Sequence, residues 1–149
     1  MTRIVAALAV ALSAAVSAQP SISDQALQAK CEALDSTGHC TLYDVSIVEL
    51  MARPEMFHGK RVRVIGYVRL EFEGNAIYLS KESYEAAITK NALWLNPPIG
   101  SALAKKGAKW GPRYAIVEGR FDATMTGHMG SFSGAITDTT RLEPWKITR

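Results

Sequence analysis

The chain has 149 residues, with 17 lysines and arginines, 14 aspartates and glutamates, and a formal charge of +3. This length fits one domain, and so small a charge does not require a polyanionic partner. There is no internal repeat, coiled-coil heptad or low-complexity tract beyond the first residues, which argues against repeat and fibrous architectures.

Residues 1–18 have the pattern of a secretory signal peptide. Arg3 supplies a short positive region, Ile4 to Ala15 is apolar, and Val16-Ser17-Ala18 offers the small residues of a cleavage site. The apolar run is shorter than the roughly 20 residues that span a bilayer. We therefore expect cleavage after Ala18, no stable membrane insertion, and a periplasmic or secreted protein; the alternative is an uncleaved anchor. Removal of Arg3 lowers the formal charge to about +2, 16 basic against 14 acidic residues.

Cys31 and Cys40 are the two cysteines of the chain. Export places them in an oxidising compartment, where pairing is the usual outcome. In the chain-entropy model, closing a loop of about ten residues contributes roughly 2.7 kcal/mol. A metal site that adds His39 is the alternative, but zinc prefers closer cysteine spacing and a fourth ligand. The sequence therefore predicts a Cys31–Cys40 disulfide and no metal.

The region after the signal, residues 19–44, is predicted to be a small extension. Its apolar spacing favours an amphipathic helix over Asp24 to Leu34, followed by a turn at residues 35–38. A short strand over Thr41 to Val45 follows. The disulfide would then tie this helix to the strand.

Residues 45–149 are predicted to form a separate β domain. Ser46 with Glu49 three residues later is a capping-box pattern, which indicates a short helix over Ser46 to Met51. A long strand over Arg61 to Leu70 then alternates valines on one side with arginines and a tyrosine on the other. Gly66 in its middle favours a bulge or a sharp bend.

The rest of the domain is expected to supply four more strands. Short helices are predicted over Lys81 to Ile88 and, as a helix or a basic loop, over Gly100 to Trp110, with a loop over Ala123 to Ser133 and a second bulge at Gly119. The strands are Ala76 to Ser80, Ala92 to Leu95, Arg113 to Phe121 and Gly134 to Leu142.

Five strands with an insert between the third and the fourth have the connectivity of an OB-fold barrel. Leu50, Pro54 and the run Phe57 to Val68 resemble the opening of small bacterial secreted OB-fold proteins, including the tRNA-anticodon-binding-like group. Tyr114 to Phe121 resembles their fourth strand. The resemblance implies a mainly β, five-stranded OB-fold-like barrel with short helices, and it carries over no catalytic residue.

Motifs for catalysis are missing from the sequence. A serine-hydrolase elbow needs Gly-x-Ser-x-Gly, and Phe132 stands at the serine position of residues 130–134. There is no Ser-x-x-Lys pair and no phosphate-binding Gly-x-x-x-x-Gly-Lys loop. The three histidines, His39, His58 and His128, are far apart and belong to no metal motif. We therefore expect a protein without enzymatic activity and without a cofactor.

The cationic, aromatic-bearing side of the long strand is the predicted binding surface. Cations beside flat rings can stack bases or sugars and pair with phosphate or carboxylate groups. The alternative is that these are solvated charges that protect a sheet edge, with Trp94 in the core. The candidate ligand-binding residues are Arg61, Arg63, Tyr67, Arg69, Tyr78, Trp94 and His128. His128 lies in a glycine-rich loop, where it contacts either a ligand or only the nearby backbone.

These observations lead to one main expectation and two alternatives. The main expectation is an exported, non-catalytic OB-fold binding module for an anionic or carbohydrate-like ligand or an envelope protein. The first alternative is a protein-facing accessory or inhibitor domain that uses the helical pieces before the barrel. The second is a weak single-stranded nucleic-acid binder, which the small charge and the export disfavour.

Overall fold

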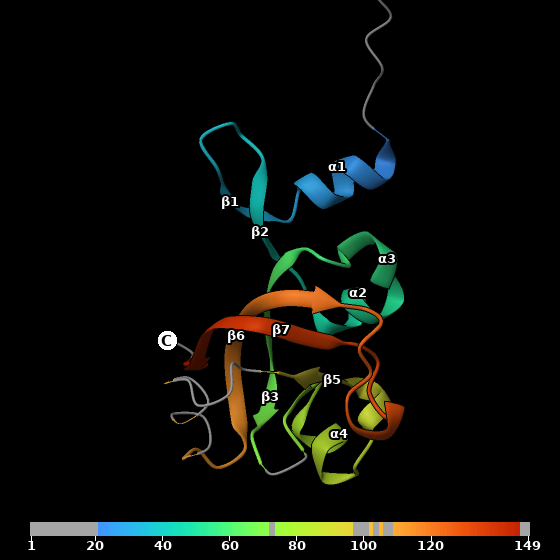
Figure 1. The fold of residues 1–149 in the computed structure, drawn as a ribbon, viewed down its shortest axis with the longest axis vertical. Coiled ribbons are helices and arrows are strands. Elements are labelled where there is room, and N and C mark those ends of the chain that lie inside the picture. The colour runs from blue at the N-terminus through green and yellow to red at the C-terminus, as the bar shows by residue number, and fades with distance from the viewer. Residues whose placement is uncertain (1–20, 72–73, 97–101, 103–104, 106–108, 147–149) are drawn as a thin grey trace, which may run out of the picture.

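The computed structural model describes residues 21–71, 74–96, 102, 105 and 109–146 (Figure 1). The predicted signal peptide and most of the predicted insert at Gly100 to Trp110 lie outside these residues. The described elements, in chain order, are α1 (Ile22–Gln28), β1 (Cys31–Leu34), β2 (Cys40–Asp44), α2 (Ile47–Ala52), α3 (Pro54–Phe57), β3 (Arg61–Arg69), β4 (Ala76–Tyr78), α4 (Lys81–Glu85), the 3-10 helix η1 (Thr89–Asn91), β5 (Ala92–Leu95), β6 (Arg113–Asp122), the 3-10 helix η2 (His128–Gly130) and β7 (Ala135–Pro144).

Five of the strands close into a barrel. The sheet order is β1-β2-β3-β4-β5-β7-β6, and an additional pairing of β3 with β6 joins the last strand to the third. The β5–β7 pairing is parallel, whereas the other pairings within the barrel are antiparallel. The prediction of a mainly β fold with a five-stranded barrel and short helices is confirmed.

Strand β3 has the alternation that the sequence predicts. Val62, Val64 and Val68 are buried in the main core, whereas Arg61 and Arg63 are only half-buried. One edge of β3 pairs with β6 along nearly its whole length, and the other edge pairs first with β2 and then with β4. Strand β3 therefore connects the barrel to the N-terminal extension.

The two predicted bulges have different outcomes. At Gly66 the β3–β6 register continues without a shift, so of the two predicted alternatives, a bulge or a sharp bend, the bulge is wrong. Gly66 is needed because a Cβ would lie 2.6 Å from Ile77 Cγ1 and 2.7 Å from Ile47 Cδ1. At Gly119 the β6–β7 register does shift, and a Cβ would lie 2.5 Å from the Thr137 carbonyl oxygen. The bulge at Gly119 is confirmed.

Helices α2 and α3 close one end of the core. Ile47 and Leu50 from α2 and Phe57 from α3 are fully buried in the same cluster as the β3 valines. The Ser46 side chain accepts from the Glu49 N–H, and the Glu49 carboxylate accepts from the Ser46 N–H at 3.2 Å. The predicted capping box is therefore confirmed. The capping box fixes the beginning of α2, so that the apolar side of the helix packs against the barrel.

The N-terminal extension differs from its prediction. Helix α1 ends at Gln28, and Cys31–Leu34 is a strand that pairs with β2 rather than the end of a helix. The pairing of β1 with β2 and the Cys31–Cys40 disulfide outweigh the helical spacing of the apolar residues, because a helix end would make neither set of contacts. Figure 1 shows this hairpin and α1 together at one end of the barrel.

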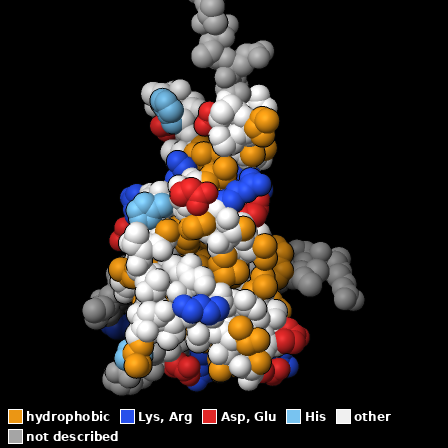
Figure 2. All heavy atoms as spheres, turned by 90° about the vertical axis from the view of Figure 1, so that its right-hand side faces the viewer, with side chains coloured by type: hydrophobic (Ala, Val, Ile, Leu, Met, Phe, Trp, Pro, Cys, Tyr) orange, Lys and Arg blue, Asp and Glu red, His pale blue; other side chains and the backbone are white. Residues whose placement is uncertain are grey.

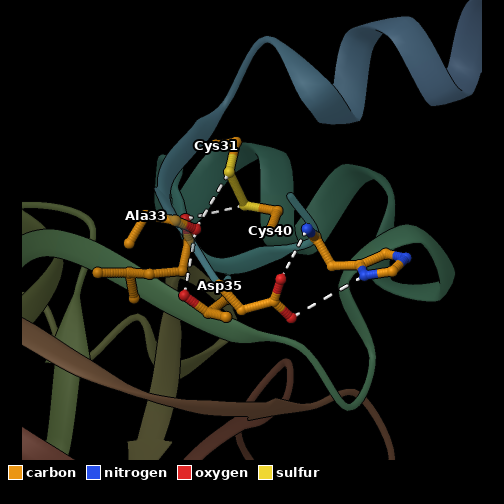
Figure 3. Close-up of a disulfide and its surroundings, with 7 residues drawn as sticks. Cys31, Ala33, Asp35 and Cys40 are labelled. Atoms are coloured by element: carbon orange, nitrogen blue, oxygen red, sulfur yellow. Dashed lines mark hydrogen bonds and ion pairs between the residues drawn. A yellow bond between two sulfur atoms is a disulfide. The ribbon is translucent and has the colours of Figure 1, made fainter. Parts of the chain in front are cut away.

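The Cys31–Cys40 disulfide is confirmed, and it joins strand to strand rather than helix to strand (Figure 3). The two Cα atoms are 5.6 Å apart, within the usual range for a disulfide. In the turn, Asp35 Oδ1 accepts from the N–H groups of Thr37 and His39 at 2.8 and 2.9 Å. These hydrogen bonds lower the pKa of Asp35, the hydrogen bond from the Thr37 side chain having the largest effect. The hairpin is therefore stabilised by hydrogen bonds at its turn and by a disulfide that links the start of β1 to the start of β2.

Candidate binding face of the barrel

The outer side of β3 carries four of the residues that the sequence marks as ligand candidates, and the structure divides these four into two groups. Arg61 and Arg63 lie near the start of the strand, beside β6 and the N-terminal hairpin. Tyr67 and Arg69 lie at the other end, where β3 pairs with β4. The predicted surface is therefore two chemically different patches along one strand.

Four of the chain's five tyrosines meet at the second patch, and we call Tyr67, Tyr78, Tyr84 and Tyr114 the tyrosine cluster. The Tyr67 ring centroid is 5.5 Å from that of Tyr84 and 5.3 Å from that of Tyr114, and Tyr78 is 5.4 Å from Tyr84. These separations are typical of favourable aromatic pairs. Tyr67 and Tyr78 are buried, whereas Tyr114 is 42% exposed, so the cluster has a fixed base and an accessible ring.

Two cations border the tyrosine cluster. Arg69 donates to Glu71 at 2.9 Å, and Lys81 forms an ion pair with Glu85 at 3.3 Å. The hydrogen bond to Glu71 raises the pKa of Arg69, and the hydrogen bond to Glu85 raises the pKa of Lys81, whose backbone N–H also contacts the Tyr114 hydroxyl at 3.4 Å. Both side chains therefore stay positively charged at any physiological pH.

Burial controls the hydroxyl chemistry of Tyr78. Burial away from solvent has the largest effect on the pKa of Tyr78 and raises it, and the nearby Glu71 and Tyr84 raise this pKa further. The phenol therefore stays protonated and can donate a hydrogen bond to a ligand or to water.

Trp94 belongs to the same outer apolar layer but faces a different neighbour. Its ring centroid is 5.3 Å from that of Phe132, and a Cβ on Gly127 would lie 2.8 Å from the indole. Trp94 packs at the edge of the cluster that contains Tyr67 and Tyr78. The structure thus brings the three predicted rings together as a packed layer that the loop after β6 covers in part.

The first patch is a network of ion pairs. Arg63 donates from Nε to Glu118 at 2.8 Å and from Nη1 to Glu32 at 2.5 Å. Glu118 also accepts from Arg141 at 3.1 Å. The hydrogen bond to Glu118 raises the pKa of Arg63. Because opposite charges are matched here, Arg63 is held in place rather than presented as an unpaired cation.

His128 lies at the exposed tip of the loop between β6 and β7. The loop is fastened by Lys90 Nζ, which donates to the Gly130 carbonyl at 3.1 Å, and by the Ser133 hydroxyl, which donates to the Lys90 carbonyl at 2.8 Å. Met129 beside it has a left-handed φ of 54° and is 86% exposed. A ligand role for His128 stays a prediction.

Sequence reasoning missed two members of the tyrosine cluster. Tyr114 could have been found, because in β6 it alternates with the buried Ala115 and Val117 and must face outward with Glu118. Tyr84 carries no such signal, because its contact with the sheet depends on where α4 packs. Its position follows only from the tertiary structure.

Figure 2 shows one face of the molecule, on which Lys and Arg side chains are interspersed with Asp and Glu rather than gathered into a block of one sign. Within the described part of the chain, no three His, Cys, Asp or Glu side chains are grouped as a metal site, and no helix there is long and apolar enough to cross a bilayer. No family model matches the chain, and comparisons with curated proteins and with solved structures also find no match.

Proposed function

We propose that this chain is an exported, non-catalytic binding module on an OB-fold barrel, and that an anionic or carbohydrate-like ligand meets the tyrosine cluster. The closed barrel with β5 parallel to β7 supports the OB-fold assignment. The Cys31–Cys40 disulfide is consistent with an oxidising compartment outside the cytoplasm.

The observation that carries the proposal is the meeting of four tyrosines with Arg69 and Lys81 on one part of the barrel exterior. Aromatic rings contribute binding energy through contact with flat apolar faces, such as those of sugar rings. A neighbouring guanidinium or ammonium group pairs with carboxylate, phosphate or sulfate. Rings and cations together therefore favour an acidic saccharide over a purely apolar ligand, with its acidic group taking the place of the Glu71 or Glu85 carboxylate beside Arg69 or Lys81.

An array of neutral, uronic-acid-containing and sulfated oligosaccharides tests this proposal with the mature, oxidised protein. We expect binding to at least one acidic class, a loss of binding in Tyr114→Ala, and its retention in Tyr114→Phe, which keeps the ring. Arg69→Gln should weaken binding, whereas Arg53→Gln, an exposed arginine between α2 and α3, should not. Binding that is equal in Tyr114→Ala and the unaltered protein would contradict the tyrosine cluster as the site.

A protein partner is the second candidate, and exposed apolar residues on the helices before the barrel favour it. Ile22 on α1 is 87% exposed and Val48 on α2 is 51% exposed. Capture of one defined envelope protein that is lost in Val48→Glu but kept in Tyr114→Ala would support this candidate. A reversal of charge at Arg61, Arg63 and Arg69 that abolishes capture would instead place the partner on the outer side of β3.

Single-stranded nucleic acid is the third candidate, because aromatic rings beside arginines also stack bases. Its binding should weaken steeply as salt rises, since phosphate contacts release counterions. A labelled oligonucleotide titrated at several salt concentrations separates it from the other two, and an affinity that is indifferent to salt excludes it.

A further inference from the structure

Two arginines lie directly opposite each other on neighbouring strands of the barrel. Arg61 on β3 is the register partner of Arg120 on β6. Side chains in such positions have Cβ atoms about 5 Å apart on the same side of the sheet, and like charges there are destabilising unless something compensates them. The next outward pair along the same strands, Arg63 and Glu118, has opposite charges. The arginine pair is thus an exception within its own sheet.

The protein compensates this pair only in part. Arg120 Nε lies 3.4 Å from Asp138 Oδ2, with the two side chains 51% and 70% exposed, and ion pairs that are this open to water are weak. Arg61 donates from Nη2 to the Thr140 hydroxyl at 2.6 Å. Among the described residues, Arg61 forms no ion pair with a carboxylate.

Unused donors remain at the arginine pair. Each guanidinium has five N–H groups. Within the described residues, Arg61 uses one of them on Thr140, and Arg120 uses one on Asp138 and another on the Gly59 carbonyl at 2.6 Å. The Thr140 hydroxyl accepts from Arg61 and can still donate its own proton. The Arg61–Arg120 register and the Arg61–Thr140 hydrogen bond therefore place two cations and a hydroxyl donor on the same side of the sheet, near the bulge at Gly119.

We propose that Arg61, Arg120 and Thr140 form a binding site for a tetrahedral oxyanion, the phosphate or sulfate group of a ligand. Such a group neutralises two guanidinium groups at once and accepts several hydrogen bonds from them. Asp138, whose carboxylate lies 3.4 Å from Arg120 Nε, competes with the ligand for Arg120 and is displaced by it. The left-handed φ of 46° at Asp138 places its carboxylate at the bulge, where it can contact Arg120.

The oxyanion site is separate from the tyrosine cluster. Arg61 and Tyr67 are six residues apart on β3, which corresponds to about 20 Å along a strand. A ligand that reaches both the oxyanion site and the tyrosine cluster would be an extended chain with a sugar ring at one end and a phosphate or sulfate near the other. The idea that one ligand bridges the two sites rests on the proposed function. The oxyanion site itself does not rest on it.

A titration of the mature, oxidised protein with inorganic sulfate and inorganic phosphate tests the site, with chloride at equal ionic strength as the comparison. The Nε–Hε signals of Arg61 and Arg120 in ¹⁵N spectra should shift saturably with sulfate or phosphate, and only weakly with chloride. Arg61→Gln and Arg120→Gln should each weaken the response by at least about tenfold, as expected for losing a charge-assisted hydrogen bond. Arg53→Gln should leave it unchanged.

Asp138→Asn provides a second, independent variant. Because it removes the competing carboxylate, it should tighten sulfate binding several-fold. Equal shifts in sulfate and chloride, or unchanged sulfate affinity in Arg61→Gln, would overturn the proposal, as would a loss of binding in Asp138→Asn. If Arg61→Gln does not fold, Thr140→Val is the substitute and should weaken binding. No saccharide is used, so failure of the tyrosine cluster in the array leaves this result unaffected.

Discussion

Glu118 on β6 and Arg63 on β3 face each other in register, with Oε1 and Nε 2.8 Å apart. Arg141 from β7 reaches the same oxygen from the other side at 3.1 Å. Burial alone would raise the pKa of Glu118, but the hydrogen bonds from Arg63 and Arg141 outweigh it and hold the pKa below its ordinary value of 4.5. These three side chains therefore join three barrel strands and make part of the barrel's stability depend on pH.

Acid should remove the contribution of Glu118. Its folded-state pKa lies below the unfolded value, so the stabilisation is complete above about pH 4.5 and is lost as pH falls through the folded-state pKa. Glu118→Gln should lower the free energy of unfolding at pH 7 by about 1–3 kcal/mol, since it leaves two arginines less well paired. Urea unfolding at pH 7 and pH 3 measures this, and the difference from the unaltered protein should shrink at pH 3.

The matched control for Glu118 is Glu55→Gln on α3, where the side chain is exposed. It should change the unfolding free energy little at either pH, as surface substitutions usually do. A Glu118→Gln deficit that is as large at pH 3 as at pH 7 would show that the substitution acts through packing rather than through charge.

A methyl group at Gly66 should destabilise the barrel. It would lie 2.7 Å from the Tyr78 carbonyl oxygen as well as within 2.7 Å of the Ile77 and Ile47 side chains. Overpacking of this kind usually costs about 1–3 kcal/mol. Gly111→Ala is the control, because a Cβ there meets no atom within 4 Å. Thermal unfolding compares the two, and equal melting temperatures would refute close packing as the reason for Gly66.

Loss of the disulfide should loosen the N-terminal hairpin more than the barrel. Closing its loop contributes roughly 2.7 kcal/mol in the chain-entropy model. The hairpin joins the barrel through two register pairs of β2 with β3, the Arg63–Glu32 ion pair and the packing of Tyr43 against the main core. In the Cys31→Ser, Cys40→Ser double variant, hydrogen exchange should speed up over residues 31–44 and change little in β6. Equal loss of protection in both regions would show that the hairpin folds as one unit with the barrel.

The fold could be predicted to a large extent because its strongest signals are local. Val62, Val64 and Val68 alternate with outward residues, and Ser46 with Glu49 forms a capping box, so one strand and one helix start follow from neighbouring residues alone. The helix predicted through Leu34 failed because residues 31–34 pair with β2, a non-local contact. Gly66 was identified as special, but the reason for it lies in Ile47 and Ile77.

The candidate site could be predicted only in part. The sequence places Arg61, Arg63, Tyr67 and Arg69 on one side of a strand, and the structure agrees. The sequence does not indicate that Arg63 is paired with Glu118. The register between β3 and β6 decides that, and it also sets Arg61 opposite Arg120.

The sequence by itself determined that the valine side of β3 is buried, where α2 begins, and that two cysteines are available to pair. Only the tertiary structure decided that Tyr84 and Tyr114 join Tyr67, that Glu118 neutralises Arg63, and that Arg61 and Arg120 are left facing each other. The reason is physical. Burial follows a short repeat along the chain, whereas the partner of a side chain depends on the register between strands that are distant in the sequence, as with Arg63 and Glu118, which are 55 residues apart.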